Sequence, residues 1–343
     1  MADSWHTHLL AAGARMVGNR ATHFGDPEAE LRAAADATVL ADLSYSGLIR
    51  LTGPDRESFL QAQLSNDVTQ LASGRAQYSA YCSPKGRVLA SLLLWRDPQA
   101  HFLQLAADLS EPTRKRLGLF VLRAKVKLED AEDDFVRIGC AGRQAREHLD
   151  RCGLALPSAP FEVCQSDGVT VIALSEQRFE LVLAPDLAPD LWNSLAKLAL
   201  PIGAQAWEGL EIGAGIPTIT ALTQDQFIPQ MLNYDAIGAI SFQKGCYPGQ
   251  EIVARTRYLG KLKRRMVLAN VKSKIAPKPA DQLYSEQLVD ASCGTVVNCA
   301  PSPSGGFDLL AVAQIESIEA HSIRWQSLEG PVLTLLPLPY ALP

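Results

Sequence analysis

The sequence predicts an α+β protein made of two ferredoxin-like domains and a small C-terminal β-barrel. Two consecutive segments show strand-like and helix-like patterns in the order β-α-β-β-α-β, which is the order of a split βαβ unit. From residue 261 onward the patterns are short strands separated by Pro, Gly and Ser. The 343 residues, 47% hydrophobic and 20% charged, are enough to build two or three folded domains.

The N-terminal part divides into an extension and a first domain. Residues 1–40 are polar with weak helical periodicity, so we expect a helical extension outside the domains. In the first domain, residues 41–133, Pro54 fits the first turn of a helix, where a missing N–H costs nothing. One more strand than the basic unit is expected there. The elements in order are the strand GLIRL, the helix after Pro54, the strands QYSAYC, RVLASLLLW and HFLQLA, the helix EPTRKRLGLFVLR and the strand AKVKLED.

The second domain, residues 134–260, repeats this pattern, and the barrel, residues 261–343, does not. In the second domain we expect the strand FVRIGCAG, the helix RQAREHLDRCG, the strands VTVIALS and RFELVLA, the helix DLAPDLWNSLAKLAL and the strand PIGAQAW. In the barrel we expect the strands RRMVLANV, CGTVVNCA, FDLLAVAQI, HSIRW and PVLTLLPL.

Charge and cysteine usage narrow the class of protein. The formal net charge is −5, so direct nucleic-acid binding is not expected from the whole surface. The seven cysteines include no CxxC and no Cys/His spacing typical of zinc, so no metal ligand is predicted. Cys293 and Cys299 could pair across a hairpin, but a reducing compartment is the simpler interpretation. With no signal peptide and no apolar run of about 18 residues, we expect a cytoplasmic protein that does not enter a membrane.

The segment SFQKGCYPGQEIVART, residues 241–256, holds the strongest chemical signal. Cys246 lies between two glycines at a bend, and Lys244 is two residues before it. A nearby ammonium group stabilises a thiolate and lowers the pKa of the thiol. The alternative is a buried cysteine that only packs. Because packing needs none of the polar neighbours, we interpret Cys246 and Lys244 as catalytic candidates.

The eight residues from Lys244 to Glu251 resemble the signature K-G-C-[YF]-x-G-Q-E of the YgfZ-type folate-binding proteins, which are relatives of the glycine-cleavage T-protein (aminomethyltransferase). The segments LTGPDRESFLQAQLSNDV, CSPKGRV, GAGIPTI, FIPQMLNYDAIGAISF and PLPYAL extend the resemblance over about residues 44–342. It implies a cloverleaf of three domains around a central channel, with tetrahydrofolate bound in the middle.

The resemblance also implies cofactor-binding residues. Trp207 matches a position that lines the folate site, where an indole could stack on a flat ring; core packing is the alternative. Asp67 is a candidate polar contact, with a local Asx turn as the alternative. Glu211 would replace a family carboxylate that falls on Gly213 here. The motif adds Tyr247, Gln250 and Glu251 to this set.

Basic residues follow the motif closely: Arg255, Arg257, Lys261, Lys263, Arg264 and Arg265. We interpret Arg255 and Arg257 as part of an anion site for a folate polyglutamate tail or for RNA phosphates. The tail is favoured, because the overall charge is acidic and no aromatic residues are interleaved for base stacking. A solvated strand edge is the alternative, and Glu251 could pair with Arg255 if the segment is helical.

Two functions fit these residues. The resemblance implies a tetrahydrofolate-binding accessory protein that assembles or repairs iron–sulfur clusters, with iron–sulfur proteins, including tRNA-thiolating enzymes, as clients. The alternative is a folate-dependent one-carbon transferase. Aminomethyl transferases of the family carry paired aspartates where this chain has Ala90 and Ser91, which argues against the alternative.

Overall fold

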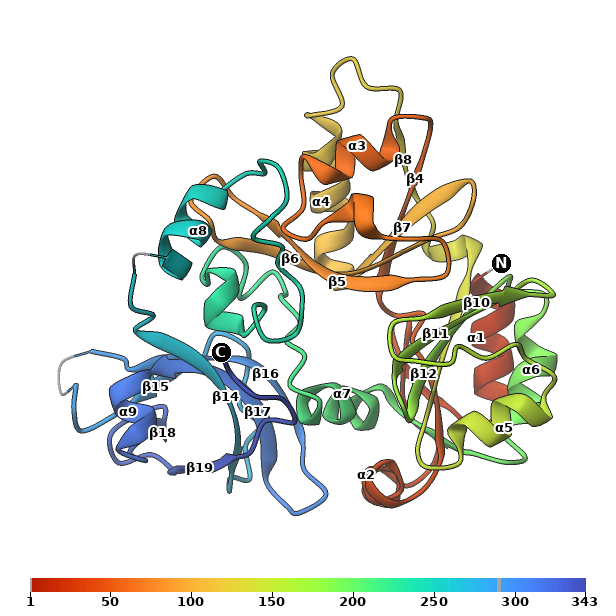
Figure 1. The fold of residues 1–343 in the computed structure, drawn as a ribbon. Coiled ribbons are helices and arrows are strands. Elements are labelled where there is room, and N and C mark those ends of the chain that lie inside the picture. Colours follow the sequence, from red (N-terminus) through yellow and green to blue (C-terminus); the bar gives the residue numbers. More distant parts are fainter. Residues whose placement is uncertain (1, 259, 289–290) are drawn as a thin grey trace.

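The computed structural model describes residues 2–258, 260–288 and 291–343, which form three lobes arranged as a triangle (Figure 1). The first two lobes are open sheets covered by helices, and the third is a curled sheet. The predicted α+β architecture is therefore confirmed. Within the described residues, no helix combines the length and the apolar character needed to cross a membrane.

The first lobe is a five-stranded antiparallel sheet in the order β5-β6-β7-β4-β8. This is the ferredoxin-like order with β5 as the predicted extra strand. Phe59 and Leu60 of the first helix and Leu109 of the second are buried against Ile49 and Leu103 of the sheet. The elements are β4 (Gly47–Thr52), α3 (Arg56–Gln61), β5 (Ala76–Cys82), β6 (Val88–Arg96), β7 (Ala100–Leu105), α4 (Ala107–Gly118) and β8 (Lys127–Asp130).

The second lobe is a six-stranded sheet in the order β10-β11-β12-β9-β3-β13. Its strands and helices are β9 (Val136–Ala141), α5 (Ala145–Arg151), β10 (Val163–Ser166), β11 (Val169–Ser175), β12 (Arg178–Leu183), α6 (Ala188–Leu195) and β13 (Leu200–Ile202). One strand, β3 (Val39–Asp42), comes from the N-terminal segment and lies between β9 and β13.

The N-terminal residues are part of this lobe, so the expectation of a separate extension is wrong. Trp5 of α1 (Ala2–Ala11) is buried edge-on against Trp192 of α6, and its indole N–H donates to Asp42 Oδ1 at 2.9 Å. A hairpin, β1 (Arg15–Val17) and β2 (Arg20–His23), and the helix α2 (Pro27–Asp36) follow. The weak periodicity of α1 hid two buried side chains, Trp5 and Leu9, on one short helix.

The chain from α7 (Ala204–Gly213) to α8 (Gln250–Tyr258) connects all three lobes and differs from the predicted second domain. The expected strand PIGAQAW ends at Ile202, and Gly203 then begins a helix. Beyond α7, Phe227 and Leu232 of the stretch around η3 (Pro229–Leu232) pack into the core of the first lobe together with Met266 of the third. Residues 214–258 therefore do not belong to the second lobe, contrary to the predicted boundary.

The third lobe is a curled sheet in the order β18-β15-β16-β17-β14-β19. Its elements are β14 (Arg264–Val271), β15 (Gln282–Tyr284), β16 (Gly294–Pro301), β17 (Phe307–Gln314), α9 (Ile315–Glu319), β18 (Arg324–Trp325) and β19 (Leu333–Leu336). The two edge strands meet, because Trp325 N–H donates to Pro331 O and Leu333 N–H donates to Ile323 O. These bonds bring the edges of the sheet together at one bridge, and the sheet curls into a half-barrel where the small barrel was expected.

Candidate cofactor site

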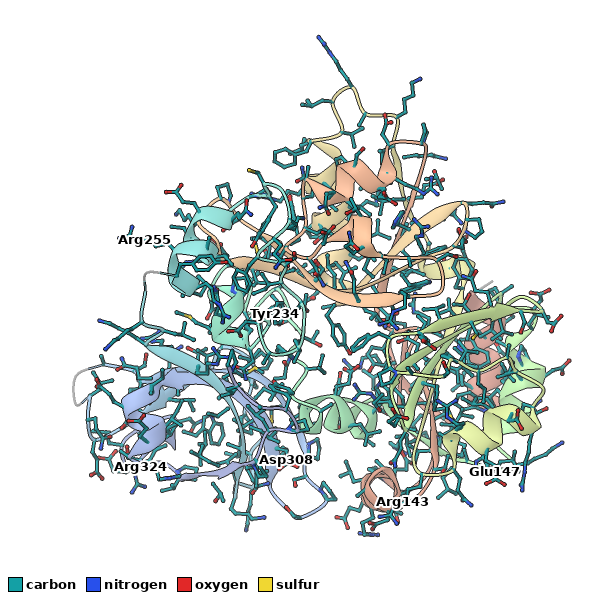
Figure 2. All side chains as sticks on the ribbon, viewed as in Figure 1. Arg143, Glu147, Tyr234, Arg255, Asp308 and Arg324 are labelled. Carbon is teal, nitrogen blue, oxygen red and sulfur yellow. The ribbon has the colours of Figure 1, made fainter. Side chains whose placement is uncertain are left out.

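A cavity of about 530 Å³ lies where the three lobes meet. Tyr78 comes from the first lobe, Glu180 from the second, Asn298 from the third and Trp207 from the connecting helix α7. Tyr234, which also lines the cavity, lies in the middle of the molecule between the lobes (Figure 2). The volume is in the range of ordinary small-molecule sites.

Trp207 lines this cavity but is also a packing residue. It is only 1% exposed, and a Cβ on Gly139 of β9 would lie 2.5 Å from its six-membered ring. Glycine is thus required under the indole, so Trp207 is a packing residue, and its stacking on a folate ring stays a prediction. Glu211, one turn further along α7, lines the cavity as well. Burial raises the pKa of Glu211, while Arg178 opposes this rise.

Most of the cavity wall was missed from the sequence, and two of the missed residues, Glu180 of β12 and Gln104 of β7, form a hydrogen-bonded pair. Glu180 is 1% exposed, and Gln104 Nε2 donates to its Oε2 at 3.2 Å. Burial raises the pKa of Glu180 to about 7, although Arg137 and Arg178 act in the opposite direction. The sequence did hold a signal for Glu180, because it is a carboxylate in the middle of the predicted strand RFELVLA, and this strand is buried in the structure.

Of the two positions of the missing aspartate pair, Ser91 lies at the cavity wall and Ala90 does not. Ala90 is buried, while Ser91 lines the cavity and accepts a hydrogen bond from Ile219 N–H at 2.9 Å. Gly213 stands where the family resemblance implies a carboxylate. A Cβ added there would meet nothing within 4 Å, so there is space for a side chain that this chain lacks. The acids that remain at the wall are Asp108, Glu180, Glu208 and Glu211.

The ammonium group of Lys244 is hydrogen-bonded to the main chain and, among the described residues, forms no hydrogen bond with the Cys246 thiol. The ammonium group donates to the main-chain carbonyls of Gln61 at 2.6 Å, Leu64 at 2.5 Å and Asn66 at 3.1 Å. Burial lowers the pKa of Lys244 to about 8. Lys244 therefore ties the motif to the end of α3 in the first lobe.

Cys246 is exposed at the surface and is not among the residues that line the cavity. The thiol of this catalytic candidate therefore does not face the cavity. All seven cysteines are free thiols, including Cys293 and Cys299.

The rest of the motif holds the bend in place. Gly249 has φ +81°, and a Cβ there would lie 2.4 Å from Ser83 O and 2.5 Å from Gly86 Cα. The motif thus packs on the hairpin SPKG between β5 and β6. Tyr247 is buried with its ring 5.1 Å from Lys244 Nζ, and Gln250 Nε2 donates to Lys244 O. Neither Tyr247 nor Gln250 lines the cavity, so the structure does not support their assignment as cofactor contacts.

Asp67 caps the short 3₁₀ helix of residues 68–70, which agrees with the alternative interpretation of a local Asx turn. Its carboxylate accepts from Thr69 N–H and Oγ1–H and from Gln61 Nε2, and the Thr69 hydroxyl is the main reason that its pKa is lowered. Asp67 does not line the cavity.

The charged residues of α8 lie on its outer side. Arg255 projects away from the middle of the molecule (Figure 2), and Arg257 lies over the ring of Phe242 at 5.4 Å. Neither lines the cavity, nor does Glu251, so the expected site for a polyglutamate tail is not part of it. In the part of the chain that the structure describes, Glu251 and Arg255 form no ion pair. Arg265 forms a paired salt bridge with Asp235 at 3.0 and 3.2 Å.

No group of three potential metal ligands occurs among the residues that the structure describes.

Comparison with known proteins gives a consistent result. The family model of the GCVT N-terminal domain matches residues 5–240. The tRNA-modifying protein YgfZ of Photorhabdus laumondii is 34% identical over 88% of this chain and 92% of that protein. The YgfZ protein of Escherichia coli O127:H6 is 31% identical over 88% of this chain and 93% of that protein. The glycine cleavage aminomethyltransferase T of Bartonella henselae has a similar fold, with a TM-score of 0.80, 18% identity and coverage of 97% and 96% of the two chains.

Proposed function

Because the chain belongs to the YgfZ family and contains the GCVT N-terminal domain, we propose that it binds a reduced folate, tetrahydrofolate, in the cavity between its lobes. The cavity itself supports this proposal most directly. Its wall combines the aromatic rings of Tyr78 and Trp207 with the carboxylates of Glu180 and Glu211. Aromatic faces suit a flat ring, and carboxylates suit its N–H groups.

The second part of the proposal concerns Cys246, which acts at the surface and not on the bound folate. We propose that the protein is a cytoplasmic accessory factor for iron–sulfur proteins, including enzymes that modify tRNA. The names of its relatives, tRNA-modifying protein YgfZ, support the link to tRNA modification. An exposed thiol outside the cavity is accessible to a client protein. One cysteine cannot hold a cluster alone, so the client would supply the remaining ligands. Binding of tRNA itself is not part of the proposal.

A one-carbon transferase is the alternative function. The Bartonella aminomethyltransferase supports the shared fold alone. Where such enzymes carry paired aspartates, this chain has Ala90, which does not line the cavity, and Ser91, which does. Neither side chain can take a proton from a reacting amine. The accessory function is therefore favoured.

Calorimetric titration with tetrahydrofolate tests the folate part. We expect saturable binding, with p-aminobenzoylglutamate, which lacks the pterin ring, as a much weaker control. No heat and no quenching of tryptophan fluorescence up to millimolar tetrahydrofolate would rule the proposal out.

The substitution Cys246→Ser tests the surface role. Since the side chain is exposed, stability should change by less than about 0.5 kcal/mol. We expect loss of complementation in a strain that lacks its own YgfZ protein, measured as the activity of iron–sulfur enzymes under oxidative stress. Cys164→Ser, at a half-buried thiol on β10, is the control and should complement. Full complementation by Cys246→Ser would refute a role for this thiol.

A further inference from the structure

The loop between α4 and β8, residues 118–126, exposes a group of apolar side chains, and we call it the α4–β8 tip. Figure 1 shows this loop projecting beyond the rest of the first lobe. Leu119, Phe120 and Leu122 are 74%, 44% and 88% exposed, and Leu122 has φ +44°, a conformation that leucine rarely adopts. Single exposed apolar side chains are ordinary, but three within four consecutive residues indicate a surface for a partner.

The tip is held in one conformation by its own hydrogen bonds and by the lobe beneath it. Ala124 N–H donates to Val121 O at 2.7 Å and closes a turn. Lys125 N–H donates to Asp55 Oδ2 at 2.7 Å, which fixes the loop to the start of α3. Val121 and Val126 pack against the buried cluster of the lobe. The exposed apolar side chains are thus presented in a preformed arrangement, so a partner can bind without first ordering the loop.

The tip and its base carry a strong positive charge. Residues 114–127 include no Asp or Glu, although the whole chain has a net charge of −5. Their cations are Arg114, Lys115, Arg116, Arg123, Lys125 and Lys127. Lys115 pairs with Glu111 and Lys127 pairs with Glu129. The other four cations form no ion pair within the described residues, so their charge is available to a partner.

A short series of contacts joins the base of the tip to the segment that carries Cys246. The guanidinium group of Arg116 is hydrogen-bonded to the Tyr81 side chain. Tyr81 forms a β-bridge with Leu64, and Leu64 O accepts from Lys244 Nζ. The exposed Cys246 follows two residues after Lys244. The apolar tip and the exposed thiol therefore belong to one region of the first lobe.

Resting on the proposed function, we propose that the α4–β8 tip is the docking site for the client iron–sulfur protein. The face of the client that receives it is an apolar hollow bordered by Asp and Glu. The apolar side chains of the tip fill the hollow, and the surrounding cations meet the carboxylates, which sets the orientation and speeds the encounter. A client held there has its cluster ligands beside Cys246.

Two other partners share part of this chemistry. RNA phosphates would pair with the cations but would leave the three apolar side chains in water. An anionic lipid surface would accept both the cations and the apolar side chains. Neither supplies the remaining ligands of a cluster to the thiol, so the position of Cys246 favours a protein.

The test uses a double variant of the tip, Leu122→Ser with Arg123→Glu. The probe is an iron–sulfur enzyme that thiolates tRNA, purified from the strain used for complementation, and biolayer interferometry measures its binding. We expect Kd to rise at least about 10-fold in the tip variant, because burial of one leucine alone accounts for that much. Added salt should weaken binding to the natural chain more than binding to the variant. The tip variant should also fail to complement.

A matched control pair lies in the third lobe, on the loop between β14 and β15. Ile275 is 68% exposed and follows the exposed Lys274. The variant Lys274→Glu with Ile275→Ser makes the same change in charge and a similar loss of apolar surface, and it should bind the enzyme as the natural chain does. Neither pair lines the cavity, so both variants should keep tetrahydrofolate binding and Tm. Equal loss of enzyme binding in both variants would indicate a general effect of charge and would overturn the docking site.

The alternative partners are tested with the same proteins. The natural chain and the tip variant are sedimented with vesicles of equal parts phosphatidylethanolamine and phosphatidylglycerol, and each is titrated with tRNA alone. We expect no difference between the two proteins in either experiment. Binding to vesicles or to tRNA that the tip variant loses, while its affinity for the enzyme is unchanged, would overturn the docking site in favour of that partner.

The outcomes separate the docking site from the proposed function. If the tip variant binds the enzyme as tightly as the natural chain and complements fully, the docking site is wrong, and the proposed function stands as long as Cys246→Ser fails to complement. If Cys246→Ser complements fully, the surface role of the thiol fails and the docking site fails with it.

Discussion

The ammonium group of Lys244 stabilises the backbone of the first lobe, although its position in the motif beside Cys246 suggested a catalytic role. Three carbonyl oxygens accept from it, and these carbonyls follow α3 closely. A lysine has three N–H donors, so this set uses all of them. The nearby thiol of Cys246 has no such contact with Lys244 among the hydrogen bonds of the described residues.

Lys244→Met should therefore act on stability and not on the thiol. It leaves three carbonyls without their donor in a buried place, so we expect a loss of about 2 kcal/mol or more in the free energy of unfolding. Urea unfolding would measure this loss. The rate at which iodoacetamide labels Cys246 should stay the same as in the natural chain. A slower rate at unchanged stability would restore the catalytic interpretation of Lys244.

The buried His101 should make the folded protein less stable in acid. It is fully buried on β7, and burial, with Arg56 and Arg96, lowers its pKa from 6.5 to about 4, against a smaller opposite effect of Asp97. In the unfolded chain this histidine binds a proton more readily than in the folded protein. The buried neutral His101 is therefore compatible with full stability above pH 6.5, and the free energy of unfolding falls as the pH drops from 6.5 toward 4. The loss should reach about 3 kcal/mol.

Urea unfolding of His101→Phe between pH 7 and pH 4.5 checks this effect. The variant should lose part of the decline in stability that the natural chain shows on the acid side. His321→Gln, at an exposed histidine, is the control and should keep the full decline. Identical pH profiles for the natural chain and His101→Phe would contradict the assignment.

Two short turns, one from the hairpin between β5 and β6 and one from the motif before α8, meet through their glycines. Gly86 has φ +69° and Gly249 has φ +81°. An added Cβ at Gly86 would lie 2.8 Å from Ile252 Cβ, and one at Gly249 would lie 2.5 Å from Gly86 Cα. The two sequence motifs KGR and KGCYPGQE are thus halves of one contact.

Gly249→Ala should destabilise the protein by about 3 kcal/mol, because backbone strain adds to a backbone collision. Gly238→Ala is the matched control. Gly238 has φ +70°, but its Cβ would meet nothing within 4 Å, so only the strain of about 1 kcal/mol should remain. Thermal unfolding compares the two. Equal losses would show that the turns do not pack as described.

The order of elements in the first lobe and the barrel could be predicted in large part, because hairpin neighbours such as β5 and β6, or β16 and β17, are close in sequence. The second lobe could be predicted only in part. β3 has four residues, and its partners are β9 and β13, about 100 and 160 residues further on. No local pattern reports such a pairing. The start of α7 was missed because Gly203 ends a strand and begins a helix within one residue.

The candidate site was predicted less well than the fold. Trp207 and Glu211 do line the cavity, because they share a helix whose position the resemblance indicated. Glu180 was overlooked because strand patterns are judged by their apolar residues. The motif residues were placed in the site because they are adjacent in sequence, but the bend before α8 turns Cys246 outward and Lys244 toward the backbone of the first lobe.

At the scale of the whole molecule, shared buried clusters and one cavity join the three lobes. Trp95 of the first lobe and Ile172 of the second belong to one such cluster. Leu60 of the first lobe, Phe227 of the connecting chain and Met266 of the barrel belong to another buried cluster. Cooperative unfolding of all three lobes is therefore expected.

A ligand in the cavity should shift this single transition as a unit. At a free concentration one hundred times Kd, 5-formyltetrahydrofolate should add about 2.7 kcal/mol to the free energy of unfolding. Scanning calorimetry should show this as a rise in Tm of several degrees. p-Aminobenzoylglutamate should cause a much smaller rise. Two separate transitions, of which only one responds to the folate, would contradict the shared core.

The position of β3 also bears on how the protein emerges from the ribosome. Residues 39–42 leave first, but β9, which begins at Val136, must follow before β3 has a neighbour. At the usual rates of synthesis, this takes about 5 to 20 seconds. During this time the first lobe, with all its strands present by Asp130, can fold while Trp5 and Leu9 remain without the sheet that buries them. The nascent N-terminal segment should therefore be a binding site for chaperones during translation, until the second lobe encloses it.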